Sequence, residues 1–309
     1  NAGDAPGHRL PRVTDPDGDR RYRFAVVYKA KLDALNNDVF TEAGPRLVTL
    51  DFDAADAYQT VYVGRNLYLG SAITQMYDGV SWVETTPVFA PDWETTETLN
   101  TNSTAGTGGM TPGLRNYVFW YEATLATGDI IRGPVSKPLQ VTVSGSDDRV
   151  TLAIPTLTIS AWGRVGGVRE DCRVCAARTI DGDTAAYYRI TSLDPSTEGN
   201  VNGYLANDQT VASVSFKDEY CDADLVLKEP IYTTGDIPSN DALGTSGIIF
   251  EGKNRIFVGS SSNANAVFFS QEQAEGYAAE FTPELSIVVP QMGGALTGGI
   301  VLDDKVLLT

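Results

Sequence analysis

Apolar and polar residues alternate along most of the chain, in segments of about five to nine residues that end at Gly, Asn, Asp or Pro. Alternation with this period is typical of β-strands with one buried face. It predicts strands over residues 22–28, 60–63, 117–124, 139–143, 150–154, 172–178, 185–191, 248–250, 255–258, 266–270 and 287–289. Turn sequences such as Asp78-Gly79 and Asp181-Gly182 separate them. The pattern therefore predicts an all-β fold, with at most a turn or two of helix in residues 271–279.

Two parts of the chain repeat one arrangement of strands. Residues 22–32 and 44–50 parallel residues 117–125 and 133–143, because each copy has an aromatic strand, a Gly-Pro pair and a second strand with a Val-Thr pair. The second copy continues to about seven strands in roughly 110 residues, the size of a fibronectin- or immunoglobulin-like sandwich. We therefore expect a sandwich over residues 113–221. Sandwich-like N-terminal strands, after a flexible start, are expected over residues 1–52.

The remaining segments have shorter strands beside aromatic turns. An example is Tyr77-Asp78-Gly79, with Trp82 three residues after the glycine. Short antiparallel strands of this kind are typical of β-propeller blades, where aromatic side chains fill the space between neighbouring blades. We expect one propeller-like blade over residues 53–112 and one to two more over residues 222–309. The predicted architecture is an incomplete set of β-propeller-like blades with the sandwich inserted between them.

Composition narrows the possible classes of protein. The chain has 309 residues, of which 42% are apolar, so it can bury a core and is not a disordered chain. No stretch approaches the roughly 18 to 20 apolar residues of a membrane-spanning helix, and no leader is visible, so we expect no membrane insertion. A single histidine, His8, argues against a His-rich metal centre and a Ser-His-Asp mechanism. Three cysteines fit folding in a reducing cytoplasm.

The net charge is −17 at pH 7, which argues against tight binding of nucleic acid, because that affinity comes mainly from Lys and Arg. The acidic excess lies in residues 51–113 and 201–309, the blade-like segments, while the sandwich-like segments are nearly neutral. Carboxylates that line a channel for DNA would repel it and keep it from sticking. We therefore expect that some of these carboxylates would face such a channel if the chain surrounds DNA.

Two motifs suggest bound metal or redox chemistry. Cys172 and Cys175 form a C-x-x-C motif, but residues three apart on a strand point to opposite faces, so we predict buried core cysteines, as for Cys221. The run from Asp15 to Asp19 resembles the start of a calcium loop. It has Arg20 where such a loop needs Gly and Val26 where it needs Glu, so we interpret it as a solvated turn. We expect no bound metal and no cofactor.

Paired carboxylates could hydrolyse a glycosidic bond without histidine. The candidate pairs are Asp92 with Glu94 and Asp222 with Asp224, although a chain with 40 acidic residues produces such pairs by chance. No G-x-x-x-x-G-K phosphate-binding motif is present, which excludes the common type of NTPase. The sequence thus favours a protein that is not an enzyme.

Aromatic residues are the remaining candidates for binding. Most of the four Trp, 14 Tyr and 11 Phe residues occupy alternating strand positions, which predicts core packing. Trp93 lies in the acidic stretch of residues 91–94 and is the first candidate for an exposed interface anchor. Tyr77 and Trp82, which flank the Asp78-Gly79 turn, are the other two candidate interface residues.

Several short motifs resemble those of structural proteins from the tails of short-tailed bacteriophages. They include residues 65–69, 77–84, 132–136, 187–190, 232–235, 254–257 and 298–302. Together they are similar to the tail nozzle, also called tail tubular protein B, in which propeller blades carry an inserted sandwich. The resemblance implies a ring, typically a hexamer, that lies beneath the portal and adaptor, closes the DNA channel and anchors fibres. It implies no catalytic residues.

The sequence thus predicts a structural virion protein of a phage tail, assembled in the host cytoplasm, that forms part of the conduit for double-stranded DNA. Family members are longer, so we expect either a portion of a longer polypeptide or a shortened member with an open propeller. Aromatic residues and acidic pairs leave two alternatives: a carbohydrate-binding or depolymerising tail spike or adhesin, and a secreted propeller lectin. A stable monomer or trimer that binds glycans would favour the first alternative.

Overall fold

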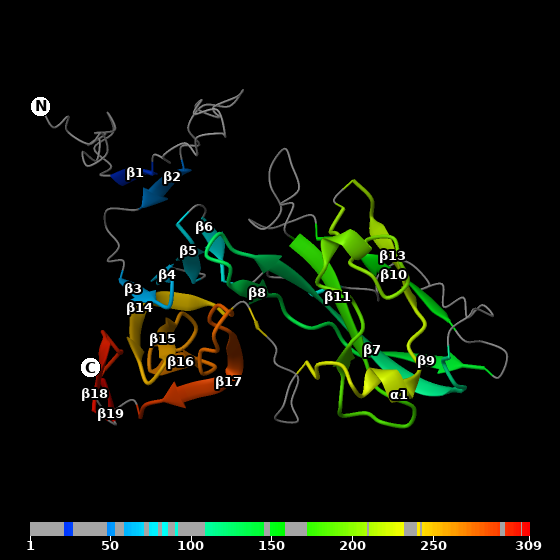
Figure 1. The fold of residues 1–309 in the computed structure, drawn as a ribbon. Helices are drawn as coiled ribbons and strands as arrows, with labels where there is room; N and C mark the ends of the chain where they lie inside the picture. The colour runs from blue at the N-terminus through cyan, green and yellow to red at the C-terminus, as the bar shows by residue number, and fades with distance from the viewer. Residues whose placement is uncertain are drawn as a thin grey trace, which may run out of the picture.

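Figure 1 shows the chain as a computed structural model. The structure describes residues 22–26, 48–52, 59–70, 74–79, 82–85, 90–91, 109–144, 149–157, 172–208, 210–231, 240–241, 243–290, 294–303 and 305–309. Regular structure in these residues is almost entirely β-strand, and the two helical pieces are a 3₁₀ turn, Pro195–Thr197, and the short helix α1, Asp222–Leu225. The prediction of an all-β fold is confirmed.

The largest sheet is curved and centred on the long strand β7, Gly113–Thr124. Its strand order is β12-β11-β7-β8, and all pairs are antiparallel. The partners of β7 are β8, Ile130–Arg132; β9, Leu139–Val143; and β11, Cys172–Arg178, which itself pairs with β12, Tyr188–Arg189. Strand β9 pairs with the start of β7 and β8 pairs with its end. The length of β7 thus lets it pair with three strands, and β12 joins the sheet through β11.

A second sheet faces one side of this curved sheet. It consists of β10, Val150–Pro155, and β13, Ser213–Asp218, in antiparallel register. Tyr117, Phe119 and Tyr121 of β7 share a buried core with Leu152 and Phe216 of the second sheet. Burial of each large apolar side chain contributes roughly 1.5–3 kcal/mol, so this core is a main source of stability.

The other side of β7 is buried as well. Val118 and Trp120 pack there with Cys175, Ala177 and Tyr187. Burial on both faces explains why β7 is a nearly continuous apolar run instead of a strict alternation. The expected strand over residues 185–191 is reduced to β12, which pairs with β11 on one edge. On its other edge, Arg189 N donates to the Glu229 carbonyl oxygen and Ile231 N donates to the Tyr187 carbonyl oxygen.

Two four-stranded antiparallel meanders form the rest of the ordered structure. The first has the order β3-β4-β5-β6 and the second β14-β15-β16-β17. The first comprises β3, Thr60–Val63; β4, Asn66–Leu69; β5, Gln75–Tyr77; and β6, Trp82–Glu84. The second comprises β14, Thr245–Gly252; β15, Arg255–Ser260; β16, Ala266–Ser270; and β17, Phe281–Val288. Lys253 and Asn254 both have positive φ, as a tight two-residue hairpin between β14 and β15 requires.

The first meander packs against one face of the second. Tyr68 and Met76 share a core with Ile249 and Val258, and the hydroxyl of Tyr68 accepts a hydrogen bond from Ala279 N at 3.1 Å. The sheets approach closely at Gly70, where a Cβ would lie 2.9 Å from the carbonyl oxygen of Gly247. A larger residue at position 70 would therefore push the two sheets apart.

The opposite face of the second meander carries a hairpin. This hairpin is formed by β18, Gly299–Leu302, and β19, Lys305–Leu308. Phe250 and Phe257 stack at a centroid distance of 4.9 Å and pack with Val301 and Val306 of the hairpin. The two meanders and the hairpin thus form three stacked layers.

A further antiparallel pair consists of β1, Tyr22–Val26, and β2, Val48–Phe52. The internal repeat in the sequence matches these two strands with β7 and β9, which also form an antiparallel pair.

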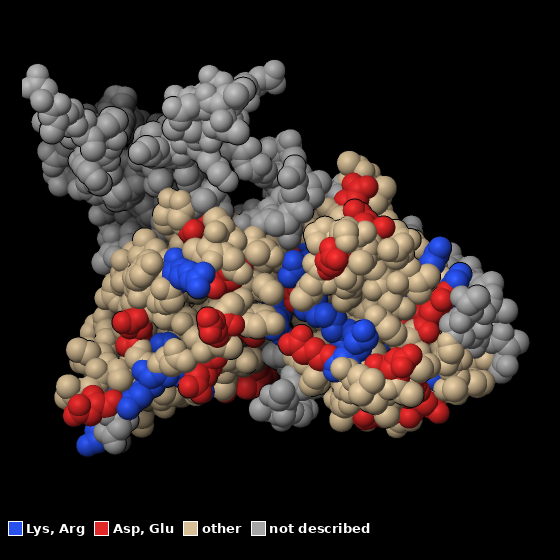
Figure 2. All heavy atoms as spheres, in the orientation of Figure 1, with Lys and Arg blue, Asp and Glu red and all other residues tan. Residues whose placement is uncertain are grey.

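Charged side chains are spread over the face drawn in Figure 2. Acidic residues lie over both the meanders and the curved sheet, and Lys and Arg gather most visibly between the two. The polar contacts between these two regions are therefore of particular interest.

Candidate functional site

The first meander presents a row of large residues on the face turned away from its core. Consecutive pairs in the strand register place four residues side by side: Tyr62, Leu67, Tyr77 and Trp82. The adjacent row, which includes Tyr68 and Met76, faces the core, so the side chains of Tyr62, Leu67 and Tyr77 lie on the outer face. Tyr62 is 66% exposed, and Leu67 and Tyr77 are half-buried. We call these three residues the outer row.

The structure brings together two of the three predicted interface residues. Tyr77 and Trp82 are direct cross-strand partners, and the Tyr77 hydroxyl donates a hydrogen bond to the Gly79 carbonyl oxygen at 3.0 Å. Trp93 lies outside the described residues. Sequence reasoning did not single out Tyr62, although its position between Val61 and Val63, which pack toward the core, is the alternation that would have placed it on the outer face.

A second apolar face belongs to the C-terminal hairpin. Val301 and Val306 point toward the second meander, so the alternating residues lie on the outside. Ile300 and Leu302 are each 59% exposed and Leu307 is 45% exposed. Ile300 and Leu307 are direct cross-strand partners, which makes the exposed apolar surface continuous across the hairpin.

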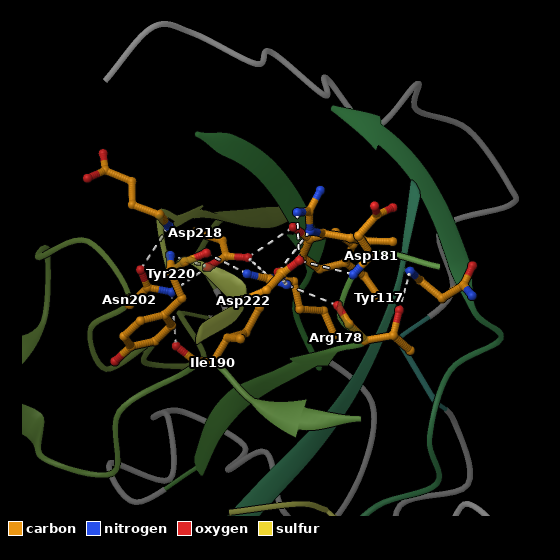
Figure 3. Close-up of polar contacts among 12 residues, drawn as sticks. Tyr117, Arg178, Asp181, Ile190, Asn202, Asp218, Tyr220 and Asp222 are labelled. Atoms are coloured by element: carbon orange, nitrogen blue, oxygen red, sulfur yellow. Dashed lines mark hydrogen bonds and ion pairs between the residues drawn. The ribbon is translucent and has the colours of Figure 1, made fainter. Parts of the chain in front are cut away.

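The sheet of β7–β9, β11 and β12 and the facing sheet of β10 and β13 share one core, and we call this pair of sheets the sandwich. A cluster of buried charges closes one end of it, and Figure 3 shows the cluster in detail. We call it the first charge cluster. The carboxylate of Asp218 accepts hydrogen bonds from Arg178 Nε at 2.6 Å, from the Tyr117 hydroxyl at 2.9 Å and from Asn202 Nδ2 at 2.8 Å. Tyr117, Arg178 and Asp218 are completely buried. Since Tyr117 and Arg178 come from the curved sheet and Asp218 ends β13, the cluster fixes the two sheets together.

Asp222 extends this cluster to the short helix α1. Its carboxylate accepts hydrogen bonds from Arg178 Nη1 at 2.8 Å and from Arg115 Nη2 at 3.0 Å. Burial raises the pKa of Asp222, but these hydrogen bonds outweigh it and lower the pKa below its ordinary value. Asp224, its predicted partner for glycosidic chemistry, is exposed. Asp222 is thus an ion-paired structural carboxylate, whereas Asp92 and Glu94 lie outside the described residues.

A second charge cluster lies on the other face of the curved sheet, around Glu122. Glu122 stands opposite Arg173 on β11 and opposite Arg132 on β8. Its carboxylate accepts hydrogen bonds from Arg173 Nε and Trp120 Nε1, each at 3.0 Å, and from Arg189. Burial would raise the pKa of Glu122, but Arg189 and Arg173 outweigh it and lower the pKa to about 2. Glu122 therefore remains ionised in a fully buried position.

Two of the three cysteines, Cys172 and Cys175, are buried in the core as predicted, whereas Cys221 is half-buried and the prediction was wrong for it. Cys172 packs in the core toward β10 and β13, whereas Cys175 packs on the opposite face with Trp120. Burial raises the pKa of the Cys175 thiol to about 12, so it does not form a reactive thiolate at neutral pH. Cys221 caps the start of α1, where its sulfur accepts a hydrogen bond from Asp224 N. The two sulfurs of the C-x-x-C motif diverge, as predicted from strand geometry.

The curved sheet and the meanders are joined by buried polar contacts. Asn240 Nδ2 donates hydrogen bonds to the carbonyl oxygens of Arg132 at 2.7 Å and Thr85 at 3.2 Å, and its Oδ1 accepts from Phe281 N at 2.8 Å. One buried amide thus connects the end of β6, the end of β8 and the start of β17. Asn66 adds a similar contact, because its Nδ2 donates to Asp129 Oδ2 at 2.9 Å in the turn between β7 and β8.

Arg132 connects the second charge cluster to the second meander. Its Nε lies 3.7 Å from Glu122 Oε1 and 3.5 Å from Glu280 Oε1, and its guanidinium carbon lies 4.2 Å from the centre of the Tyr277 ring. Neither Arg132 Nε nor Glu280 Oε1 has a hydrogen-bond partner. Burial raises the pKa of Glu280, Arg132 opposes this, and Glu122 adds to it. Glu280 is therefore the least well compensated charge at this junction.

Two further findings bear on possible functions. In the part of the chain that the structure describes, no group of three or more His, Cys, Asp or Glu side chains could hold a metal ion. Among the same residues, none of the helices has the length and hydropathy needed to cross a bilayer. The predicted calcium-like run, Asp15 to Asp19, lies outside the described residues.

Comparisons with known proteins give no match among family models, curated proteins or solved structures. Function therefore has to be argued from the layers of the fold, their exposed faces and the buried charge clusters.

Proposed function

We propose that the chain is a structural subunit of a bacteriophage tail, of the nozzle type, whose copies form a ring around the path of DNA ejection. The observation that carries this proposal is the stack of three antiparallel layers, formed by β3–β6, β14–β17 and β18–β19. Each layer packs face to face on the next, which is how the blades of a propeller pack. In this proposal, the meanders are blades.

The order of the layers along the chain supports an inserted sandwich. The first meander ends at Glu84 and the second begins at Thr245, yet the two pack directly on each other. The curved sheet and its facing pair of strands lie between them in sequence, so they interrupt two adjacent layers. We propose that residues 113–221 are a fibronectin- or immunoglobulin-like domain inserted between two propeller blades.

The buried charges support a structural role over a catalytic one. The carboxylates of Glu122, Asp218 and Asp222 each accept a hydrogen bond from at least one arginine. These hydrogen bonds connect strands of different sheets or residues that are far apart in the sequence. A general acid or base instead needs a carboxylate that can reach a substrate and exchange a proton near the working pH. We propose on this basis that the chain is not an enzyme.

The acidity of the blade-like segments supports a conduit that does not hold DNA tightly. Described acidic residues in these segments include several that are exposed: Asp224, Glu229, Glu251, Glu284 and Asp303. We propose that carboxylates of residues 51–113 or 201–309 face the channel, where like charges repel the phosphates of passing DNA. A structure of the assembled ring with all of these carboxylates on its outer surface would contradict this proposal.

The proposal is tested by examining assembly and binding of the purified chain together with adaptor and portal proteins. Multi-angle light scattering and negative-stain microscopy should reveal a ring, with a hexamer as the expected stoichiometry. Fibre proteins should attach to its sides. A stable monomer or trimer that binds glycans would instead support the alternative, a carbohydrate-binding or depolymerising tail spike or adhesin.

A further inference from the structure

The curved sheet and the second meander meet at a short stretch of backbone pairing. Ile130 of β8 forms a parallel bridge with Tyr277, which lies just before β17. In this bridge, Ile130 N donates to the Gly276 carbonyl oxygen at 2.8 Å, and Ala278 N donates to the Ile130 carbonyl oxygen at 2.9 Å. The side-chain amide of Asn240 joins the same two elements, β8 and β17. We call these contacts the junction. A contact this short can open locally while the sheets on either side stay folded.

Glu280 lies within the junction, and its carboxylate is poorly matched. Its buried Oε1 lies 3.5 Å from Arg132 Nε, and neither atom forms a hydrogen bond with another described residue. Arg132 Nε also lies 3.7 Å from the carboxylate of Glu122, so one arginine is shared by two carboxylates. Glu122 has further partners, since Arg173 and Arg189 both donate to it. Glu280 therefore depends on Arg132 much more than Glu122 does.

The charged groups around Glu280 come from the elements that pack against it. Burial, the largest effect, raises the pKa of Glu280; the Arg132 guanidinium on β8 opposes this rise, and the Glu122 carboxylate on β7 adds to it. A further carboxyl group, that of half-buried Asp241, belongs to a segment whose backbone donates to the Phe281 carbonyl oxygen at 2.8 Å. The surroundings of Glu280 thus favour the neutral carboxyl over the carboxylate.

We propose that the junction is a pH-sensitive contact, which is closed when Glu280 carries a proton and opens more often when Glu280 is ionised. A neutral carboxyl can be buried at a much lower cost than a carboxylate that lacks hydrogen-bond donors. Opening of the junction admits water to the carboxylate, so ionisation and opening favour each other. The second meander is therefore held more firmly against the curved sheet in acidic surroundings. This response belongs to the isolated chain and does not depend on the proposed ring.

Few other groups of the chain titrate between pH 5 and 8. The sequence contains one histidine, His8, and ordinary carboxyl and thiol groups have pKa values below or above this range. Loosening of the junction within this range would therefore point to a carboxyl group with a raised pKa.

The first experiment measures hydrogen exchange of single amides in the full chain between pH 5 and 8, corrected for the intrinsic exchange rate at each pH. The amides of Ile130 and Ala278, which form the junction, should lose about three- to fivefold of their protection as the pH rises. Amides of β7 and β11 should keep theirs. Glu280→Gln keeps the shape of the side chain without its charge, so protection at the junction should no longer change with pH.

Two control variants separate Glu280 from neighbouring carboxyl groups. Glu275→Gln removes an exposed carboxylate two residues before Tyr277, and Asp241→Asn removes the half-buried one. Both should keep the pH dependence of the unmodified chain. Protection of β7 and β11 shows that each variant is folded. If Asp241→Asn abolished the pH dependence while Glu280→Gln kept it, the assignment to Glu280 would be overturned.

The second experiment follows the carboxyl carbon of Glu280 by NMR in the unmodified chain, with the signal assigned through its backbone resonances. The titration midpoint should lie above the ordinary value of 4.5. A midpoint at or below 4.5 would overturn the proposal. So would protection at the junction that stays constant, or increases, between pH 5 and 8.

Discussion

The sandwich and the stack of meanders use opposite means to form stable structure. The sandwich is joined by buried ion pairs, such as Arg178 with Asp218, whose carboxylate also accepts hydrogen bonds from Tyr117 and Asn202. The stack is held by apolar faces and close glycine contacts, and the described residues include exposed apolar side chains at its two ends, Tyr62 on one and Ile300, Leu302 and Leu307 on the other. A buried charge network needs specific partners and so completes a unit, whereas an apolar sheet face can accept any complementary face. The sandwich is thus joined by specific polar pairs, and the stack is joined by less specific apolar packing.

The strongest test of this comparison removes a buried carboxylate from the sandwich. Asp218→Ala leaves the Arg178 guanidinium buried without its main partner, which should lower the free energy of unfolding by about 3–5 kcal/mol. Urea denaturation monitored by tryptophan fluorescence measures the change. Asp224→Ala, at an exposed position, is the control and should stay within about 0.5 kcal/mol of the unmodified chain. Equal effects of the two substitutions would contradict the role of the Arg178–Asp218 pair in joining the two sheets of the sandwich.

The next test uses the pH dependence of Glu122. Its pKa is lowered from the ordinary value of 4.5 to about 2, so its ionised form stabilises the fold above pH 4.5. That contribution, roughly 3 kcal/mol by linkage, is lost as the pH falls from about 4.5 toward 2. Glu122→Gln should lower stability at pH 7 and flatten this part of the profile. Parallel stability curves for the two proteins between pH 5 and 2.5 would refute the assignment.

A substitution with an expected effect of intermediate size tests the stack of meanders. Gly252→Ala places a methyl group against Val301 and should destabilise docking of the hairpin by about 1–3 kcal/mol. Hydrogen exchange should rise in β18 and β19 while the curved sheet stays protected. The double variant Gly252→Ala with Val301→Ala restores the space and should recover part of the loss. Equal loss of protection in the curved sheet would show that the two regions are not separate in stability.

The smallest expected effect lies at the junction of the two regions. Burial raises the pKa of Glu280 in the folded state above its ordinary value of 4.5. The protonated carboxyl therefore contributes its full stabilisation below pH 4.5, and this contribution is lost as the pH rises through the folded-state pKa. Glu280→Gln removes the charge and should raise stability at pH 7 by about 1 kcal/mol or less, with little change at pH 4. Thermal unfolding at both pH values measures it. A loss of stability at pH 7 would mean that the ionised pair with Arg132 is favourable.

Much of the secondary structure could be predicted from the alternation of residues. Strands β3, β9, β11 and β16 have the predicted bounds, and the turns at Asp78-Gly79 and Asp181-Gly182 have glycines with positive φ. Strand β8 was missed because its three residues, Ile130–Arg132, are too short to show a period. Strand β17 is longer than expected, because pairing with β16 supports polar residues that have no apolar alternation of their own.

The candidate sites were only partly predictable. Tyr77 and Trp82 were selected for their place beside a turn, and their role as an interface remains a prediction. Tyr62 and Leu67 join them only through the register of four strands. The charge clusters gave no sequence signal, because Arg178 and Asp218 are 40 residues apart and Asn240 bonds to Thr85 across 155 residues. Single acidic and basic residues are common in any chain, so their pairing appears only when the sheets meet.

The sequence by itself determined the all-β class, most turns, and which residues share a strand face, since a period of two and the needs of glycine turns are local properties. It also placed Cys172 and Cys175 on opposite faces. Tertiary structure alone decided that the two meanders pack on each other although the sandwich separates them in sequence. It also decided that Glu122 and Asp218 are buried with arginine partners. These features depend on pairing between distant strands, which packing of the whole core selects and which no local pattern encodes.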